Sequence, residues 1–151
     1  MQKLLSAAPS SRTKVGELLL WLSDDVIEIT NEELSKKNIS ISKLGILVLF
    51  LRKDFSENSL SPSAIAKRLR ITRASVTNHL NWLEHQGYIQ RRKLGKDQRN
   101  VDVQITEKGK TFLDEVYPFF LDVCADFFKA LTDEEVAVML KLLSKIHDSI
   151  G

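Results

Sequence analysis

The stretch "TRASVTNHLNWLEHQGYIQRRKLGKDQRNVDVQITEKG", residues 72–109, decides the fold. Thr72 is well suited to cap a helix, and apolar residues then recur at every third or fourth position until Gly87, which is suited to end that helix. The stripe that we expect to be buried is Val76, Leu80 and Leu83. Two strands are predicted next, at about 88–93 and 100–105, so the helix should run directly into a β-hairpin.

The hairpin combines a basic tip with a patterned strand. Residues 91–99 hold five cations and a single acid, Asp97. The strand after the tip alternates between two kinds of residue: Val101, Val103 and Ile105 are apolar, whereas Asp102 and Gln104 are polar. This alternation predicts a strand that buries its apolar side chains in the core and turns its polar side chains to solvent.

A shorter helix is predicted just before this stretch. Ser61 is suited to the N-cap, and Pro62 is suited to the first helical position, where its missing N–H costs nothing. This helix should end near Arg70, about three residues before the next helix begins. Two helices joined by so short a turn indicate a helix-turn-helix, although the Gly that is frequent in such turns is absent.

The rest of the chain is predicted to be helical. Apolar spacing indicates a long helix at about 13–36 and a second, largely buried helix that is capped by Ser40 and runs to about Lys53. Thr106 is suited to cap a helix after the hairpin, and Thr132–Glu135 has the pattern of a capping box before the last helix. The predicted fold class is therefore mostly α with a small β-hairpin.

Charge is distributed unevenly along the chain. The 151 residues, enough for one domain, carry a net charge of +2. Residues 61–110 alone hold eleven Lys and Arg against four Asp and Glu, and the remaining chain is acidic. A basic module of this kind favours a nucleic-acid partner, although a basic surface can also be merely solvated.

Several classes of protein do not fit the sequence. The longest apolar runs are too short to span a bilayer, and a single Cys cannot form an internal disulfide, so we expect a cytoplasmic protein with no membrane partner. Cys124 lies on an apolar stripe, which favours a buried hydrophobe over a redox switch. The three His residues lack metal-ligand spacing with one another, and no catalytic or nucleotide-binding motif appears. We therefore expect no enzyme, cofactor or metal.

The helix capped by Thr72 carries a face suited to DNA. Opposite its buried stripe lie side chains that are small or carry amides, namely Ala74, Ser75, Asn78 and Asn81. Such residues can read base edges in the major groove. The cations of the hairpin can meet phosphates, and Asp97 can hold Arg99 for a narrow minor groove. The expected DNA contacts are Ser61, Ser63, Thr72, Arg73, Ser75, Thr77, Asn78, Arg91, Lys96, Asp97 and Arg99.

These motifs resemble those of the MarR family of bacterial transcriptional regulators. Asp97-Gln98-Arg99 matches the Asp-x-Arg of that family's wing, and Ile105-Thr106-Glu107-Lys108-Gly109 matches its Leu-Thr-x-x-Gly with Ile in place of Leu. The resemblance extends over the whole chain in motif, spacing and order. It implies a recognition helix at 73–86 in the major groove and a wing at 91–100 whose arginine enters the minor groove.

The resemblance also assigns a role to the two ends of the chain. It implies a single domain, 1–151, in which helices at about 13–37 and 107–150 interlock with those of a second subunit, and about 40–106 form the winged helix-turn-helix lobe. Apolar stripes on the terminal helices favour the same homodimer. A two-fold dimer would bind a pseudo-palindromic operator in double-stranded DNA, with half-sites about one helical turn apart.

The resemblance implies a ligand-responsive repressor, with a small aromatic or phenolic effector bound between the two lobes. The sequence does not identify the residues that would line such a site, and it leaves open whether an effector exists. A helical protein–protein interaction module, whose basic lobe meets an acidic partner, is the alternative function. Binding to random duplex DNA separates the two, because the interaction module should not bind it.

Overall fold

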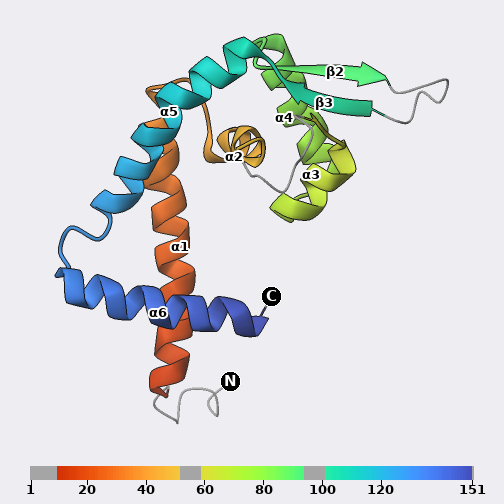
Figure 1. Ribbon diagram of the computed structural model, residues 1–151. Coiled ribbons are helices and arrows are strands. Elements are labelled where there is room, and N and C mark those ends of the chain that lie inside the picture. The colour runs from red at the N-terminus through yellow and green to blue at the C-terminus, as the bar shows by residue number, and fades with distance from the viewer. Residues whose placement is uncertain (1–9, 52–58, 94–100, 151) are drawn as a thin grey trace.

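The computed structural model describes residues 10–51, 59–93 and 101–150 (Figure 1). In chain order the elements within these ranges are α1 (Ser11–Ser35), α2 (Ile41–Leu49), β1 (Ser59–Leu60), α3 (Pro62–Leu69), α4 (Arg73–His85), β2 (Ile89–Lys93), β3 (Val101–Ile105), α5 (Glu107–Asp126) and α6 (Asp133–Ile150). The predicted fold class, mostly α with a small β-hairpin, is confirmed.

The elements divide into a compact lobe and an extended helical part. Figure 1 shows α2, α3, α4 and the sheet gathered at one end of the molecule, with α1 running away from them. α5 leads from β3 back to α1, and the two helices pack together where they meet. Beyond α5 the chain turns into α6, which crosses the far part of α1.

The helix-turn-helix forms as the sequence predicted. The Ser61 hydroxyl oxygen accepts a hydrogen bond from the Ala64 N–H at 3.1 Å, and Pro62 occupies the first turn of α3. The Thr72 hydroxyl oxygen accepts from the Ser75 N–H at 3.1 Å and so caps α4. Arg70 ends α3 in the left-handed region, at φ 53° and ψ 37°, and takes the conformation for which a turn glycine is usual.

The sheet contains a strand that the sequence analysis did not predict. Its strand order is β1-β3-β2, with both pairings antiparallel, so β3 is the central strand. The prediction that Asp102 faces open solvent is wrong, because only 7% of this residue is exposed. Strands on both sides flank β3, and the Gln104 side-chain amide donates a hydrogen bond to the Asp102 carboxylate at 3.1 Å.

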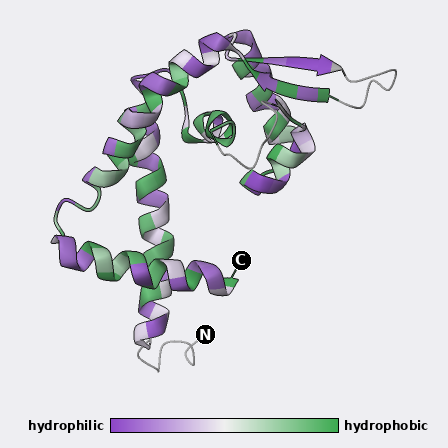
Figure 2. Ribbon diagram, in the orientation of Figure 1, coloured by the Kyte–Doolittle hydropathy of each residue, from purple (hydrophilic) through white to green (hydrophobic). Residues whose placement is uncertain are grey.

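α2 forms the middle of the lobe's core, and Figure 2 shows it as the most uniformly apolar helix. Its buried residues are Leu44, Ile46, Leu47 and Leu49. Two expectations for this helix are wrong. It ends at Leu49 rather than near Lys53, and the Ser40 side chain makes no capping hydrogen bond. The Asn31 side-chain oxygen of α1 accepts from the Ile41 N–H instead, at 2.9 Å.

Hydrogen bonds and close backbone packing hold the start of α5 against the turn between α4 and β2. The Thr106 hydroxyl donates a hydrogen bond to the Gly87 carbonyl at 2.7 Å, and the Thr106 N–H donates to the Tyr88 carbonyl at 3.0 Å. A Cβ atom on Gly109 would lie 2.0 Å from the Tyr88 carbonyl oxygen. The glycine of the Ile-Thr-x-x-Gly motif is therefore required because backbone passes directly against it.

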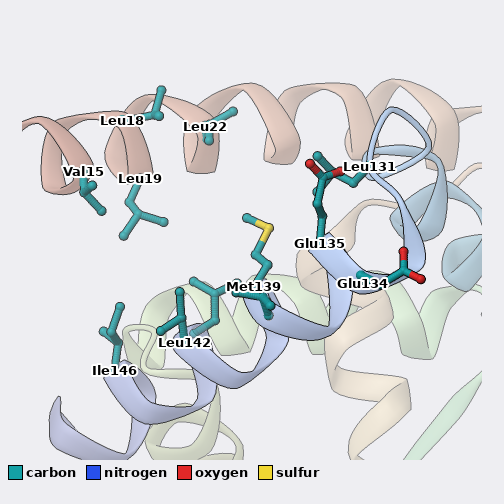
Figure 3. A pocket seen from close by; sticks show the side chains of 12 residues that line it. Val15, Leu18, Leu19, Leu22, Leu131, Glu134, Glu135, Met139, Leu142 and Ile146 are labelled. Atoms are coloured by element: carbon teal, nitrogen blue, oxygen red, sulfur yellow. The ribbon is translucent and has the colours of Figure 1, made fainter.

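An apolar cleft separates the far part of α1 from α6 (Figure 3). Its volume is about 580 Å³, and its aliphatic lining includes Val15, Leu18, Leu22, Leu142 and Ile146. The capping box of α6 forms as predicted, with the Thr132 N–H donating to the Glu135 carboxylate at 2.9 Å. No residue of α6 is buried, so the apolar face of this helix has no covering partner among the described residues.

Candidate nucleic-acid interface

The exposed side of α4 is uncharged except for a cation at its start. Val76, Leu80 and Leu83 are essentially fully buried, as predicted, which turns the opposite face to solvent. The exposed residues of that face are Arg73, Ala74, Thr77, Asn78 and Asn81. The sequence has no Asp or Glu from residue 59 through residue 83, so this face can approach a polyanion without like-charge repulsion.

Several of the predicted contacts already use their hydroxyl groups within the protein. Ser61 and Thr72 act as helix caps, and the hydroxyls of Thr72 and Ser75 lie 2.9 Å apart. The Thr77 hydroxyl donates to the Arg73 carbonyl at 3.0 Å. A hydroxyl oxygen retains acceptor capacity in such bonds, but these side chains are held in fixed orientations. Thr72, Ser75 and Thr77 are thereby fixed at the N-terminus of α4, and Ser61 is fixed at the N-terminus of α3.

Arg91 was predicted as a phosphate contact, but the structure directs its guanidinium toward α4. Its Nε donates a hydrogen bond to Oε2 of Glu84 at 2.9 Å, and its Nη2 donates both to that carboxylate oxygen and to Oδ1 of Asn81, the latter at 2.7 Å. The backbone N–H of Arg91 donates to Oε1 of Glu84 at 3.2 Å. These hydrogen bonds hold the pKa of Glu84 below its ordinary value.

The register of the strands explains why the Arg91 side chain points toward α4. Ile89 pairs with Ile105 and Arg91 pairs with Val103, so Arg91 shares the face of the sheet that packs on the helices. Arg92 pairs with Asp102 on the other face and is exposed. Lys96, Asp97 and Arg99, the predicted residues of the wing tip, lie outside the described residues.

A second hollow lies where α1, α2 and α4 come together. Its volume is about 770 Å³, and it is lined by Asn31, Ser35, Asn38, Ile39, Ser40, Lys43, Trp82 and Gln86. The Lys43 ammonium lies 4.4 Å from the centroid of a Trp82 ring. His79 lies on α4, as Trp82 does, and its pKa is lowered by burial and, to a smaller extent, by the Lys43 charge. The hollow therefore combines an aromatic wall, one cation and several amide groups.

Other kinds of site find little support within the described ranges. There, no three His, Cys, Asp or Glu side chains gather closely enough to hold a metal ion. Cys124 is half-buried, and burial raises the pKa of its thiol, which disfavours the reactive thiolate. None of the described helices combines the length and the hydropathy needed to cross a membrane.

Sequence reasoning missed Glu84 as a site residue and treated Asn81 only as part of a polar face. A signal for the link to Arg91 was present in the alternation of the strand. Ile89 is apolar and faces the core, so a residue two positions later must point to the same side. An arginine in that position needs an acid from the packed helix, and Glu84 lies near the end of that helix.

Comparisons with known proteins agree with this geometry. A family model described as "MarR family" matches residues 51–101 of the chain. The chain is also similar to the HTH-type transcriptional repressor YetL of Bacillus subtilis, with 26% identity over 133 residues that cover 88% of this chain and 78% of YetL. This similarity reaches well beyond the helix-turn-helix and the hairpin.

Solved structures share the fold. A mutant of Escherichia coli MarR complexed with operator DNA has a TM-score of 0.73 and 24% identity, and the likeness covers 88% of this chain and 93% of that chain. Bordetella bronchiseptica BpsR, whose DNA binding is regulated by 6-hydroxynicotinic acid, has a TM-score of 0.76 and 20% identity, with 89% and 98% covered. At these identities the likeness is evidence for the fold alone.

Proposed function

Because this chain belongs to the MarR family of winged helix-turn-helix, DNA-binding transcriptional regulators, we propose that it is a ligand-responsive repressor that binds a pseudo-palindromic operator as a homodimer. The observation that carries this proposal is the exposed face of α4, which has no acid and is rich in small and amide side chains. These groups can approach base edges closely enough to read them.

The DNA-binding surface combines two elements. α4 and the residue after it, 73–86, enter the major groove, with Arg73 and Asn78 directed to bases or phosphates. The wing, residues 91–100, reaches along the duplex and inserts Arg99 into the minor groove, where the negative potential is strongest. The other hydroxyl residues predicted above contact the phosphate backbone around the N-termini of α3 and α4.

The homodimer forms through the terminal helices. Support comes from the apolar cleft between α1 and α6. Leu18 and Leu142 line this cleft on the apolar faces of the two helices, yet they are 53% and 54% exposed. Exposed apolar area of this extent marks a protein interface more often than a free surface. The lobe limits follow: about 13–37 and 107–150 form the dimerisation lobe, and about 40–106 form the DNA-binding lobe.

The effector binds in the hollow between α1, α2 and α4. An aromatic carboxylate would stack on Trp82 and place its charge near the Lys43 ammonium, and the surrounding amides would satisfy its polar groups. Because this hollow touches both lobes, an occupant there can change how α4 sits relative to α1. BpsR, which has the same fold, is regulated by 6-hydroxynicotinic acid, a compound of this chemical class.

Fluorescence tests the effector site. In a Trp21→Phe variant the remaining tryptophan is Trp82, so titration with 6-hydroxynicotinic acid should change its emission in a saturable manner. Adding Lys43→Ala to this variant should weaken the response strongly, because the carboxylate loses its cation. Emission that stays constant up to millimolar ligand would remove this compound from the proposal.

Duplex DNA tests the function itself. The full chain should bind random duplex weakly, and log K should fall steeply with log salt, by about 0.9 for each phosphate contact. A protein-interaction module with a basic lobe would not bind duplex DNA at all. Absence of binding at 50 mM salt would therefore overturn the proposed function and favour that module.

A further inference from the structure

The recognition helix and the hairpin are joined by one carboxylate. Glu84 on α4 accepts hydrogen bonds from the backbone N–H of Arg91 at 3.2 Å and from its Nε at 2.9 Å, as well as from Nη2. Both side chains are partly shielded, with 27% of Arg91 and 38% of Glu84 exposed. We call these two residues and Asn81, which Arg91 also binds, the α4–β2 clamp.

The clamp uses the arginine edge that would otherwise bind a phosphate. Nε and Nη2 of Arg91 form the side of the guanidinium that fits a carboxylate or phosphate with two parallel bonds, and here both face Glu84. A phosphate contact through this edge would first have to break the ion pair. Leaving the carboxylate of Glu84 near the DNA without its cation would also add repulsion.

The clamp fixes the chemistry that Asn81 presents. Arginine has donors and no acceptor, so the side-chain oxygen of Asn81, rather than its nitrogen, must face Arg91, and the 2.7 Å bond to Oδ1 agrees. The amide NH₂ is then left to point outward. Asn81 is exposed and lies on the face of α4 opposite the buried stripe.

We propose that Arg91 acts on DNA through Asn81: the α4–β2 clamp locks the hairpin to α4 and turns Asn81 into a hydrogen-bond donor toward an acceptor on the DNA. Arg91 and Glu84 are positioning residues. Arg91 takes one of the two lone pairs of Oδ1 and fixes the orientation of the amide, so Asn81 meets DNA through its NH₂ rather than through the bidentate adenine contact typical of asparagine. The acceptor is a base atom such as O6 or N7 of guanine, or a phosphate oxygen. This inference rests on the proposed DNA-binding function.

The first test compares two arginines in one strand. Arg91→Ala and Arg92→Ala remove the same charge, but only Arg91 belongs to the clamp, whereas Arg92 lies exposed on the other face of β2. Affinities for a selected operator and for random duplex are measured at several salt concentrations. Arg91→Ala should reduce the operator-to-random ratio roughly tenfold or more and leave the salt slope unchanged relative to the wild type. A uniform loss on both DNAs with a slope lower by about 0.9 would overturn the proposal.

A direct phosphate contact by Arg91 and the α4–β2 clamp predict opposite effects of Glu84→Ala on DNA binding. If Arg91 were a phosphate contact, removing Glu84 would free it and strengthen binding to both DNAs. The clamp predicts weaker discrimination, because Asn81 and the hairpin lose their support. Thermal unfolding of the variants confirms that they fold, and tighter operator binding by a folded Glu84→Ala variant would overturn the inference.

Asn81→Ala separates the two acceptors. A lost preference at one position of each half-site identifies a base, a uniform loss of affinity identifies a phosphate, and unchanged affinity on both DNAs would overturn the role of Asn81.

A measurement on the wild-type protein does not depend on any variant folding. In the ¹⁵N-labelled full chain, the Nε–H of Arg91 should exchange slowly without DNA and keep its resonance when operator is added, whereas the Asn81 amide should shift. A shifted Arg91 resonance beside an unmoved Asn81 amide would overturn the inference. Wild-type protein that binds no duplex DNA would overturn the proposed function, and with it the role of Asn81.

Discussion

Gly109→Ala should destabilise the protein strongly, because the substitution places a methyl group inside occupied space. The new Cβ would lie 2.0 Å from the Tyr88 carbonyl oxygen and 2.9 Å from Cγ1 of Ile105, and backbone cannot swing aside as a side chain can. The Tyr88 carbonyl also accepts hydrogen bonds from the N–H and the hydroxyl of Thr106, and a shift would weaken both.

The magnitude follows from these contacts. Overpacking costs about 1–3 kcal/mol, and each lost hydrogen bond costs about 1 kcal/mol. Alanine recovers up to about 1 kcal/mol through its higher helix propensity. The expected loss is about 2–4 kcal/mol in the free energy of unfolding, which lowers Tm by roughly 5–15 °C in a chain of this size.

Gly45→Ala is the matched control for this prediction. Gly45 also lies within a helix, but its added Cβ would meet only Cδ2 of Leu69 at 3.8 Å, an ordinary contact. Helix propensity should therefore dominate and raise Tm by a few degrees. Both variants are compared by thermal unfolding at one protein concentration, because the proposed dimerisation would make Tm concentration-dependent. A Gly109→Ala variant with the same Tm as the wild type would refute the steric argument.

Three further predictions concern DNA, assembly and pH. Arg99→Ala should weaken operator binding by about 1–3 kcal/mol in a gel shift, and unchanged affinity would exclude its role in the wing. Leu142→Asp places a charge in the apolar cleft and should yield monomers in sedimentation, whereas a dimer of unchanged stability would contradict the interface. His79, with its pKa lowered by burial and by Lys43, should titrate by NMR below an ordinary histidine, and Lys43→Ala should raise the midpoint. The unfolded chain binds this proton more tightly than the folded chain, so the free energy of unfolding should fall as the pH drops from the ordinary histidine pKa to the lowered one. Lys43→Ala should make this loss of stability smaller, and a larger loss would contradict the assigned effect of the Lys43 charge.

Local sequence patterns predicted the helix-turn-helix because each signal acts within a few residues. The caps at Ser61 and Thr72 satisfy N–H groups three positions later, and the stripe from Val76 to Leu83 follows from helix periodicity alone. The capping box at the start of α6 formed for the same reason. These predictions depended only on neighbours in the sequence, and the structure agrees with them.

Failures occurred where distant segments meet. β1 contains two residues and acquires its strand geometry by pairing with β3, more than forty residues later in the chain, so no local pattern marks it. That pairing makes β3 central and buries Asp102, against the alternation. The start of α2 is satisfied by Asn31 from α1 rather than by its own Ser40, which only tertiary packing can decide.

The candidate site shows the same division. Its exposed face on α4 could be derived from periodicity, and the signature at 97–99 came from resemblance. The orientation of Arg91 depends on the register of the hairpin and on the acid on α4, whereas its charge alone indicates only a phosphate contact. The sequence analysis placed the end of α3 near Arg70 but not its left-handed backbone, because such a conformation at a non-glycine residue leaves no trace in composition.

The most direct test of the central claim is selection of bound sequences from a random pool of duplex DNA with the full-length protein. The account predicts a pseudo-palindromic consensus whose half-sites are centred about one helical turn, ~34 Å, apart, because a two-fold dimer presents two α4 helices to successive major grooves. A pool that remains random after repeated rounds, or a consensus without two-fold symmetry, would contradict a dimeric sequence-specific regulator.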